Sequence, residues 1–244
     1  YREVAALLKT DRASLEPTKA VSKYSAVVVD ETQDFGPQAL KLLRALIAPG
    51  VNDLFFVGDG HQRIYSRNKA AMGKCGIDIR GRARKLYINY RTTDEIRRQA
   101  VALLEGIEVN DLDDGHDEAK RYRSLSHGPV PDVERVHGLE GAFTAVSRFL
   151  GQWREQGAEP CELTFCVVAS SEKSRDALAL QLRQSGVRTV AITAQSNHTD
   201  ERGVVYLSTM HRAKGLEFDC VAVVAPAVYV DEMAQGSNRR QLLY

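Results

Sequence analysis

The sequence lacks long apolar runs, a strong charge of one sign and closely spaced cysteines. None of its 244 residues falls in a stretch approaching the roughly 18 apolar residues of a membrane span, so we expect no membrane partner. The net charge of +1 gives no overall basic field, and any nucleic-acid contact must come from a local site. The four cysteines show no metal-binding spacing, which predicts reduced thiols in a cytoplasmic protein.

Two further absences concern phosphate binding and targeting. No Gly-rich loop ending in Gly-Lys-Ser or Gly-Lys-Thr occurs anywhere in the chain. The first residue is Tyr1 rather than Met, and no charged-then-apolar leader follows it. We therefore expect that the chain begins inside a longer protein or has been trimmed. Its 43% hydrophobic and 27% charged residues are typical of a soluble globular protein of one large or two small domains.

Short apolar runs alternate with segments of helical periodicity. This alternation favours parallel sheets covered by helices, with ligands at the ends of the strands. The predicted strands are 27–29, 54–57, 85–88, 133–136, 163–168, 189–192, 204–207 and 220–224, and the predicted helices are 38–47, 94–104, 140–156 and 172–185.

The segment 27–34 reads VVVDETQD, an apolar strand that ends on adjacent carboxylates. Asp30 can hold Mg²⁺, usually through water, while Glu31 orients or deprotonates an attacking water. On the Asp-Glu pair alone, a buried strand followed by a polar turn is an equally good interpretation.

A second strand end, in the segment 54–65, reads LFFVGDGHQRIY. A neutral amide at the end of a strand can hydrogen-bond a terminal phosphate oxygen, and an aromatic ring can stack on a base. Taken alone, Tyr65 is more simply a half-buried packing residue. In the segment 86–93, LYINYRTT, the planar guanidinium of Arg91 suits a phosphate, although a solvated arginine at a capped helix is the simpler interpretation in isolation.

The longest of the segments, 204–218, reads VVYLSTMHRAKGLEF. A strand leads into a short turn that carries hydroxyl, imidazole and ammonium groups followed by glycine, and such a turn can present donors to phosphates. Together and in order, the four segments resemble motifs II, III, IV and V of superfamily I DNA helicases of the UvrD, Rep and PcrA type. The resemblance covers most of 24–100 and 203–244.

The resemblance implies an α/β fold of two RecA-like P-loop NTPase lobes with parallel sheets, the first incomplete. Residues 1–88 would form the C-terminal part of the first lobe, with motifs II and III. Residues 89–244 would form the second, with motifs IV and V and the start of motif VI. ATP would lie between the lobes and single-stranded DNA across them.

Several roles toward ATP and Mg²⁺ follow from the same motifs. The catalytic residues would be Asp30, Glu31, Gln62 and Arg91, converging on one triphosphate pocket, with Asp30 and Glu31 also serving the metal. Three further residues would lie on the nucleotide side: Tyr90, which would stack on adenine, and Gly215 and Glu217.

The DNA-binding residues implied by the resemblance come from motifs III and V. Tyr65 and Arg67 would stack on bases, and Arg67 stands where the family usually has a tryptophan followed by an arginine. Thr209 and His211 would contact the strand, and Lys214 would support the same turn. Outside this segment His211 would more simply be structural.

Two catalytic parts of the family are missing from the chain. The first is the phosphate-binding loop described above. The second is an arginine: after a segment like 238–244 (NRRQLLY), the family continues with a Thr-Arg pair, and that arginine contributes about 10³–10⁵ in rate. We therefore predict an ATPase in the parent protein and none in these residues alone.

The predicted function is an ATP-dependent DNA helicase that moves 3′ to 5′ on single-stranded or partly duplex DNA, with possible protein partners in repair or recombination. Two alternatives remain open: the motor subunit of an ATP-dependent nuclease, and a non-catalytic DNA-binding module that keeps the motor fold. The retained Asp30, Glu31, Gln62 and Arg91 argue against the second.

Overall fold

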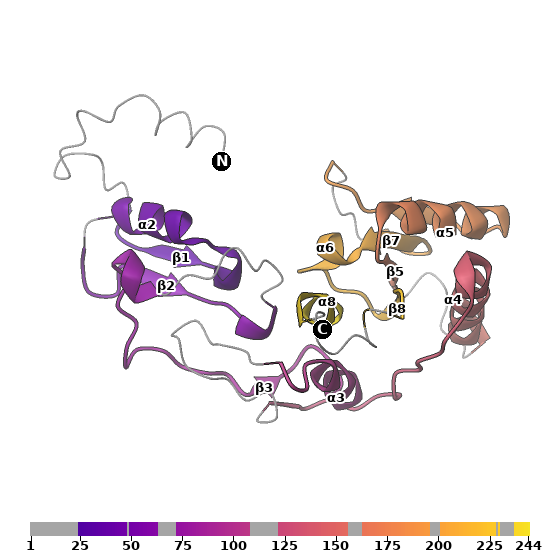
Figure 1. Ribbon diagram of the computed structural model, residues 1–244, viewed down its shortest axis with the longest axis horizontal. Helices are drawn as coiled ribbons and strands as arrows, with labels where there is room; N and C mark the ends of the chain where they lie inside the picture. Colours follow the sequence, from indigo (N-terminus) through magenta and orange to yellow (C-terminus); the bar gives the residue numbers. More distant parts are fainter. Residues whose placement is uncertain are drawn as a thin grey trace. The chain divides into compact units, whose positions relative to one another are not determined.

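The computed structural model in Figure 1 describes eight parts of the chain, namely residues 24–47, 49–62, 72–107, 122–155, 163–195, 201–227, 229 and 237–244. These residues form two compact units. The first unit contains the described residues up to Tyr87, and the second contains those from Ile88 onward.

The first unit is built on two parallel strands, β1 (Val27–Val29) and β2 (Leu54–Phe56), which pair with Val28 opposite Phe55. Between them lie the short 3-10 helix η1 (Thr32–Asp34) and α2 (Pro37–Ala45), while η2 (Gly60–Gln62) and η4 (Met72–Cys75) follow β2. Pro37 begins α2 in its first turn, where the missing N–H has no intrahelical partner to lose.

The core of the first unit lies on one face of this small sheet. Leu40 of α2 is buried with Met72, Cys75 and Ile77, and Leu54 and Phe56 pack against them. Because side chains alternate along a strand, Val28 and Phe55 point to the opposite face, where they are 72% and 61% exposed. The alternation of side chains along β2 therefore places one face of the sheet against the core and leaves side chains of the other face exposed.

The second unit contains a four-stranded parallel sheet in the order β6-β7-β5-β8. Its strands are β5 (Phe165–Ala169), β6 (Thr189–Ala191), β7 (Val205–Thr209) and β8 (Cys220–Val224), and its long helices are α4 (Gly138–Glu155) and α5 (Glu172–Gln184). Every residue of β5 is buried, as expected for a central strand covered on both faces. The expectation of a mixed α/β fold with parallel sheets is thus confirmed.

Two hydrophobic clusters cover the two faces of this sheet. Helices α4 and α5 pack on one face, where Val146, Leu150, Leu178 and Leu182 surround Leu207 of β7. On the other face, the ring of Tyr206 lies 5.6 Å from that of Phe218. This second cluster also includes Met210 of α6 (Met210–Ala213) and Leu242 of α8 (Ser237–Leu243).

A second, shorter parallel pair precedes this sheet in the chain. Strand β3 (Ile88–Asn89) pairs with β4 (Arg123–Ser124), and α3 (Asp94–Leu103) follows β3 directly. The side chain of Thr93 caps α3 by accepting a hydrogen bond from the N–H of Ile96 at 3.4 Å. The predicted start of this helix at residue 94 is confirmed.

The structure corrects two of the predicted strands. The segment 133–136 is not a strand, and Val133 is 72% exposed. In the segment 85–88 only Ile88 belongs to a strand, and Leu86 is 83% exposed. Residues 133–136 and 85–87 are strand-forming residues that pair with no strand among the described residues, and pairing decides where strands form.

The three described cysteines, Cys75, Cys166 and Cys220, are free thiols, and Cys161 lies outside the described residues. Burial raises the pKa of Cys166 to about 12 and that of Cys220 to about 11, so both stay protonated. None of the helices in the described parts of the chain has the length and apolar character needed to cross a membrane.

Candidate functional site

The carboxyl ends of β1 and β2 bring together three of the predicted catalytic residues. The two strands are parallel neighbours with Val29 opposite Phe56, so the residues after each strand meet at one edge of the sheet. Asp30 and Glu31 follow β1, and Gln62 lies in the turn that follows β2. The sequence placed these three side chains at strand ends, and the pairing of β1 with β2 explains why they share an edge.

Glu31 occupies a backbone conformation that is rare for a residue with a side chain, with φ 51° and ψ 40°. Such left-handed geometry costs about 1–3 kcal/mol and persists only where neighbouring contacts enforce it. Here the N–H of Thr32 donates to the carbonyl of Val57 at 3.0 Å, and the Thr32 hydroxyl donates to the same oxygen at 2.7 Å. These contacts fix the turn after β1 against the end of β2.

Gln33 bridges the two turns with both ends of its side-chain amide. Its Nε2 donates to Oε2 of Glu31 at 2.5 Å, and its Oε1 accepts from the N–H of Asp59 at 3.0 Å. The side chain is buried, with only 2% of the residue exposed. Sequence analysis treated Gln33 only as part of the motif, although an amide two residues after a pair of acids is a signal that could have singled it out.

Asp59 organises the turn that carries Gln62. Its Oδ1 accepts from the backbone N–H of His61 at 2.9 Å and lies 3.1 Å from Nδ1 of the same residue, and its Oδ2 accepts from Nε2 of Gln62 at 3.0 Å. Although burial opposes ionisation of this carboxyl, the hydrogen bonds from His61 and Gln62 hold the pKa of Asp59 below its ordinary value. Because an amide NH₂ has two hydrogens, Gln62 has a second donor besides the one that bonds Asp59.

Asp30 and Glu31 are suited to a hydrated magnesium ion. Asp30 is exposed, and the structure gives its Oδ1 a hydrogen bond from the N–H of Glu31 at 2.8 Å. Mg²⁺ keeps several waters and needs only one or two protein carboxylates, so this pair fits the ion. Within the described parts of the chain, no group of three or more His, Cys, Asp or Glu residues could hold a metal.

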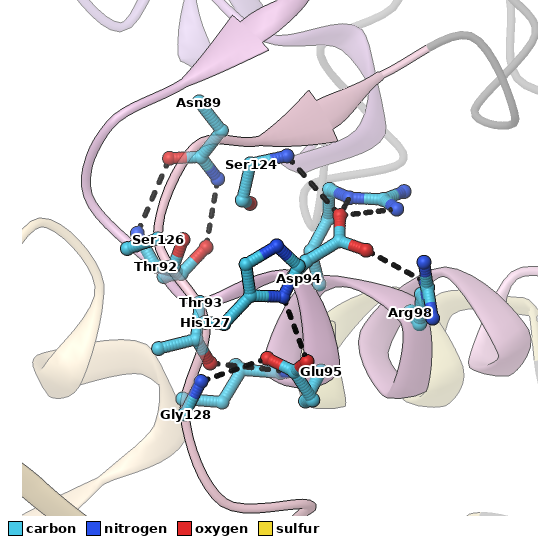
Figure 2. Close-up of polar contacts among 12 residues, drawn as sticks. Asn89, Thr92, Thr93, Asp94, Glu95, Arg98, Ser124, Ser126, His127 and Gly128 are labelled. Carbon is cyan, nitrogen blue, oxygen red and sulfur yellow. Dashed lines mark hydrogen bonds and ion pairs between the residues drawn. The ribbon is translucent and has the colours of Figure 1, made fainter.

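In the second unit, Asn89 shapes the turn that carries Arg91, and Figure 2 shows its side chain beside Thr92. Its Oδ1 accepts from the N–H groups of Arg91 at 2.8 Å and Thr92 at 3.2 Å, and its Nδ2 donates to the Thr92 hydroxyl at 2.7 Å. The Ser126 hydroxyl donates to the carbonyl of Thr92 at 3.3 Å. Both sides of the Arg91 turn are therefore held, one by its own strand and the other by the segment after β4.

The first turn of α3 ties that segment in place, as Figure 2 shows. The buried carboxylate of Asp94 bonds Arg97 and Arg98, each at 2.7 Å, and accepts from the N–H of Ser124 at 3.2 Å. The hydrogen bond from Arg97, followed by that from Ser124, lowers the pKa of Asp94. We call residues 122–128 the return segment, because they bring the chain back beside β3.

Glu95 binds the far end of the return segment. One of its oxygens lies 3.0 Å from Nδ1 of His127, and the other accepts from the N–H of Gly128 at 2.9 Å. The His127 contact, followed by that of Gly128, lowers the pKa of Glu95 to about 2. A Cβ on Gly128 would lie 2.8 Å from the methyl of Thr93, the residue that caps α3, so this close approach requires glycine.

The side chain of Arg91 reaches two residues of the segment that follows β7. Its Nε lies 2.6 Å from Oε1 of Glu217, and one of its terminal nitrogens donates to the carbonyl of Leu216 at 3.2 Å. The side chains of Arg91 and Glu217 are 51% and 69% exposed. The structure thus joins two residues that the resemblance had placed separately near the nucleotide.

The remaining predicted residues of the second unit lie at the end of β7 and after β3. Thr209 ends β7, His211 lies exposed in α6, and Lys214 follows α6 directly. Gly215 adopts φ 81°, which is open to glycine and strained for other residues. Tyr90 is 75% exposed beside Arg91.

Two of the predicted DNA-binding residues, Tyr65 and Arg67, lie outside the described residues. The predicted approach of Arg91 to Asp30, Glu31 and Gln62 stays a prediction, since Arg91 belongs to the second unit and the others to the first.

Comparison with known proteins adds one match. Residues 3–75 match the family model of the UvrD/REP helicase N-terminal domain. This segment includes β1, β2 and the network from Glu31 to Gln62. The resemblance to UvrD-like superfamily I helicases is thereby confirmed. No curated protein matches the chain.

Proposed function

We propose that this chain, which carries the UvrD-like superfamily I helicase segment, serves an ATP-dependent DNA translocase. The observation that carries the proposal is the meeting of Asp30, Glu31 and Gln62 at the carboxyl edge of β1 and β2, within the segment that the family model matches. Two carboxylates and a neutral amide at one strand edge are among the groups that phosphoryl transfer uses.

The role of each residue follows from its chemistry. Mg²⁺ would neutralise charge on the phosphates, and Asp30 would hold it through water. Glu31 would orient or deprotonate the attacking water. Gln62 would donate to the terminal phosphate, and Arg91 would contact the same group with its planar guanidinium. Each of these steps is positioning or electrostatic stabilisation, which is most of what this reaction needs from a protein.

The same proposal assigns adenine stacking to Tyr90 and the nucleotide side of the motif V turn to Gly215 and Glu217. Single-stranded DNA would contact Tyr65, Arg67, Thr209, His211 and Lys214. In this proposal two RecA-like lobes close on ATP and reopen after hydrolysis, and the strand moves 3′ to 5′.

DNA binding by the 244-residue chain is the first test. Fluorescence anisotropy with a labelled single strand should give an affinity that falls as salt rises, because phosphate contacts release counterions. Lys214→Ala should weaken binding, whereas Lys173→Ala, which removes the same charge from an exposed position in α5, should not. Equal effects of the two substitutions would argue against a DNA site at the turn after β7.

ATP hydrolysis is the second test. No Gly-Lys-Ser or Gly-Lys-Thr loop occurs in these residues, so we expect no DNA-stimulated hydrolysis from them alone. In a longer protein that supplies this loop and the motif VI arginine, hydrolysis should be stimulated by DNA and abolished by Glu31→Gln. DNA binding without hydrolysis in that longer protein would favour a non-catalytic module, and DNA cleavage there would favour a nuclease subunit.

A further inference from the structure

We propose that Gln33 is a positioning residue that orients Glu31 and couples it to the turn carrying Gln62. The coupling is a property of the described residues, and its meaning for catalysis rests on the proposed function. Gln33 and Asp59 lie between Glu31 and Gln62 and connect them by hydrogen bonds.

The first step is the bond between Gln33 and Glu31. The carboxylate of Glu31 accepts from Nε2 of Gln33 at 2.5 Å, a short, charge-assisted hydrogen bond. Glu31 also has a strained backbone at φ 51°, so its side chain leaves the strand end in a direction that the neighbouring contacts must maintain. The buried amide of Gln33 supplies such a contact from inside the unit.

The second step is the bond between Gln33 and the turn after β2. Oε1 of Gln33 accepts from the N–H of Asp59 at 3.0 Å, and Oδ2 of Asp59 accepts from Nε2 of Gln62 at 3.0 Å. Glu31, Gln33, Asp59 and Gln62 therefore form one continuous chain of hydrogen bonds. A change in the bonds of Gln62 alters Asp59, and Gln33 transmits it to Glu31.

An amide fits the position of Gln33 well. The side chain must donate to a carboxylate at one end and accept from a backbone N–H at the other, and an amide offers one donor group and one acceptor. Glutamate at this position would place a second carboxylate against Glu31, and leucine would leave both partners without the bond. The length of the side chain matters too, because the two partners lie in turns after different strands.

A comparison of variants of the 244-residue chain by NMR tests the coupling without any reaction. Gln33→Leu should speed hydrogen exchange of the Asp59 N–H by about tenfold, the loss expected for one hydrogen bond of ordinary strength. Glu31→Gln should shift the side-chain amide resonances of Gln62 when Gln33 is present, and should leave them unchanged in the Gln33→Leu background. Gln38→Leu, at an exposed position of α2, is the matched control.

Kinetics in a longer protein with DNA-stimulated ATPase activity test the catalytic meaning. Gln33→Glu and Gln33→Leu should lower kcat by about 10- to 100-fold, as loss of an orienting partner typically does, with KM for ATP nearly unchanged. Gln38→Glu should change neither constant. If Gln33 had a purely structural role, its substitution would lower the folded fraction of the protein or raise KM for ATP instead.

The outcomes separate the two proposals. The coupling is overturned if the Gln62 resonances respond to Glu31→Gln equally well without Gln33, and the positioning role in catalysis is overturned if kcat is unaffected by both Gln33 substitutions. An unsubstituted longer protein that binds DNA and hydrolyses no ATP overturns the proposed function instead, and the NMR result on the hydrogen-bond chain still stands. Loss of coupling together with a fall in kcat supports both.

Discussion

The two units hold their predicted phosphate-binding groups in different ways. In the first, Glu31 and Gln62 are linked through a buried amide and a carboxylate, and their turns are joined by main-chain bonds. In the second, the backbone of Arg91 is fixed while its side chain rests on Glu217, and both side chains are more than half exposed. The first unit thus fixes the orientation of the Glu31 and Gln62 side chains, whereas the second unit fixes only the backbone position of Arg91.

The physical difference lies in the surroundings of each contact. A buried amide that loses a partner leaves an unsatisfied polar group, which costs about 1–3 kcal/mol. An exposed ion pair can exchange its partner for water or another charge at little cost, since such pairs are worth about 0–1 kcal/mol. We infer that Gln62 and Glu31 are pre-organised, whereas Arg91 can readily leave Glu217 for a phosphate.

Acid should weaken both units and have the largest effect on stability, because several carboxylates act together. The hydrogen bond from Arg44 to Asp53 and that from His127 to Glu95 lower each pKa to about 2 in the fold. Since these values lie below the ordinary ones, the stabilisation is present above about pH 4.5 and is lost as pH falls toward 2. Circular dichroism melts across this range should show the loss.

Asp53→Asn with Glu95→Gln is the variant that tests this assignment. It should flatten the pH dependence between pH 4.5 and 2 relative to the unsubstituted chain. An unchanged slope would mean that other groups govern acid unfolding.

Asp59→Ala should have the next largest effect and should act on the first unit. It removes the carboxylate that accepts from both His61 and Gln62, and we expect a loss of roughly 2 kcal/mol, at the low end for bonds to a charged group because the carboxylate is partly exposed. Urea unfolding measures this loss. Asp78→Ala removes an exposed carboxylate that pairs with Arg80, and should change stability far less.

Thr32→Val should cost about 1 kcal/mol. The substitution keeps the buried shape but removes the hydroxyl that donates to Val57, whose carbonyl still receives the N–H of residue 32. Thr144→Val, at an exposed position of α4 where the hydroxyl bonds its own helix, is the control. Equal costs for the two substitutions would show that burial of the turn after β1 adds nothing.

Arg91→Ala should have the smallest effect on folding. Because its pair with Glu217 is exposed, we expect the free energy of unfolding to stay within about 0.5 kcal/mol and the difference to shrink further in high salt. A loss above about 1 kcal/mol would contradict the idea that this side chain is free to change partners.

The local sequence pattern predicted the strands and helix starts that depend mainly on neighbouring residues in the chain. The apolar run before Asp30 became β1, Thr93 capped α3, and the run after Asp219 became β8, which pairs with β5. Side chains at strand ends were predicted because parallel strands present their carboxyl ends together. The segment 133–136 was predicted wrongly because strand-forming residues need a neighbouring strand, and the sequence around them does not reveal whether one is present.

The contacts that orient the side chains of the candidate site could not be predicted from the sequence. The bond from Gln33 to the N–H of Asp59 depends on the register of β1 with β2, and the pair of Arg91 with Glu217 joins positions 126 residues apart. The return segment has no clear periodicity, yet four of its residues, from Ser124 to Gly128, bind the start of α3 or the Arg91 turn. Such partners follow from tertiary pairing, which no short window of residues encodes.

The parallel pairing of β3 with β4 has a consequence for how this protein can change over evolution or by design. The environment of Arg91 is assembled from two stretches that recognise each other through main-chain bonds and the acids of α3. A substitution in the return segment can therefore move the arginine as much as one beside it in the sequence. A mutant library designed to tune this side chain needs to vary both stretches together.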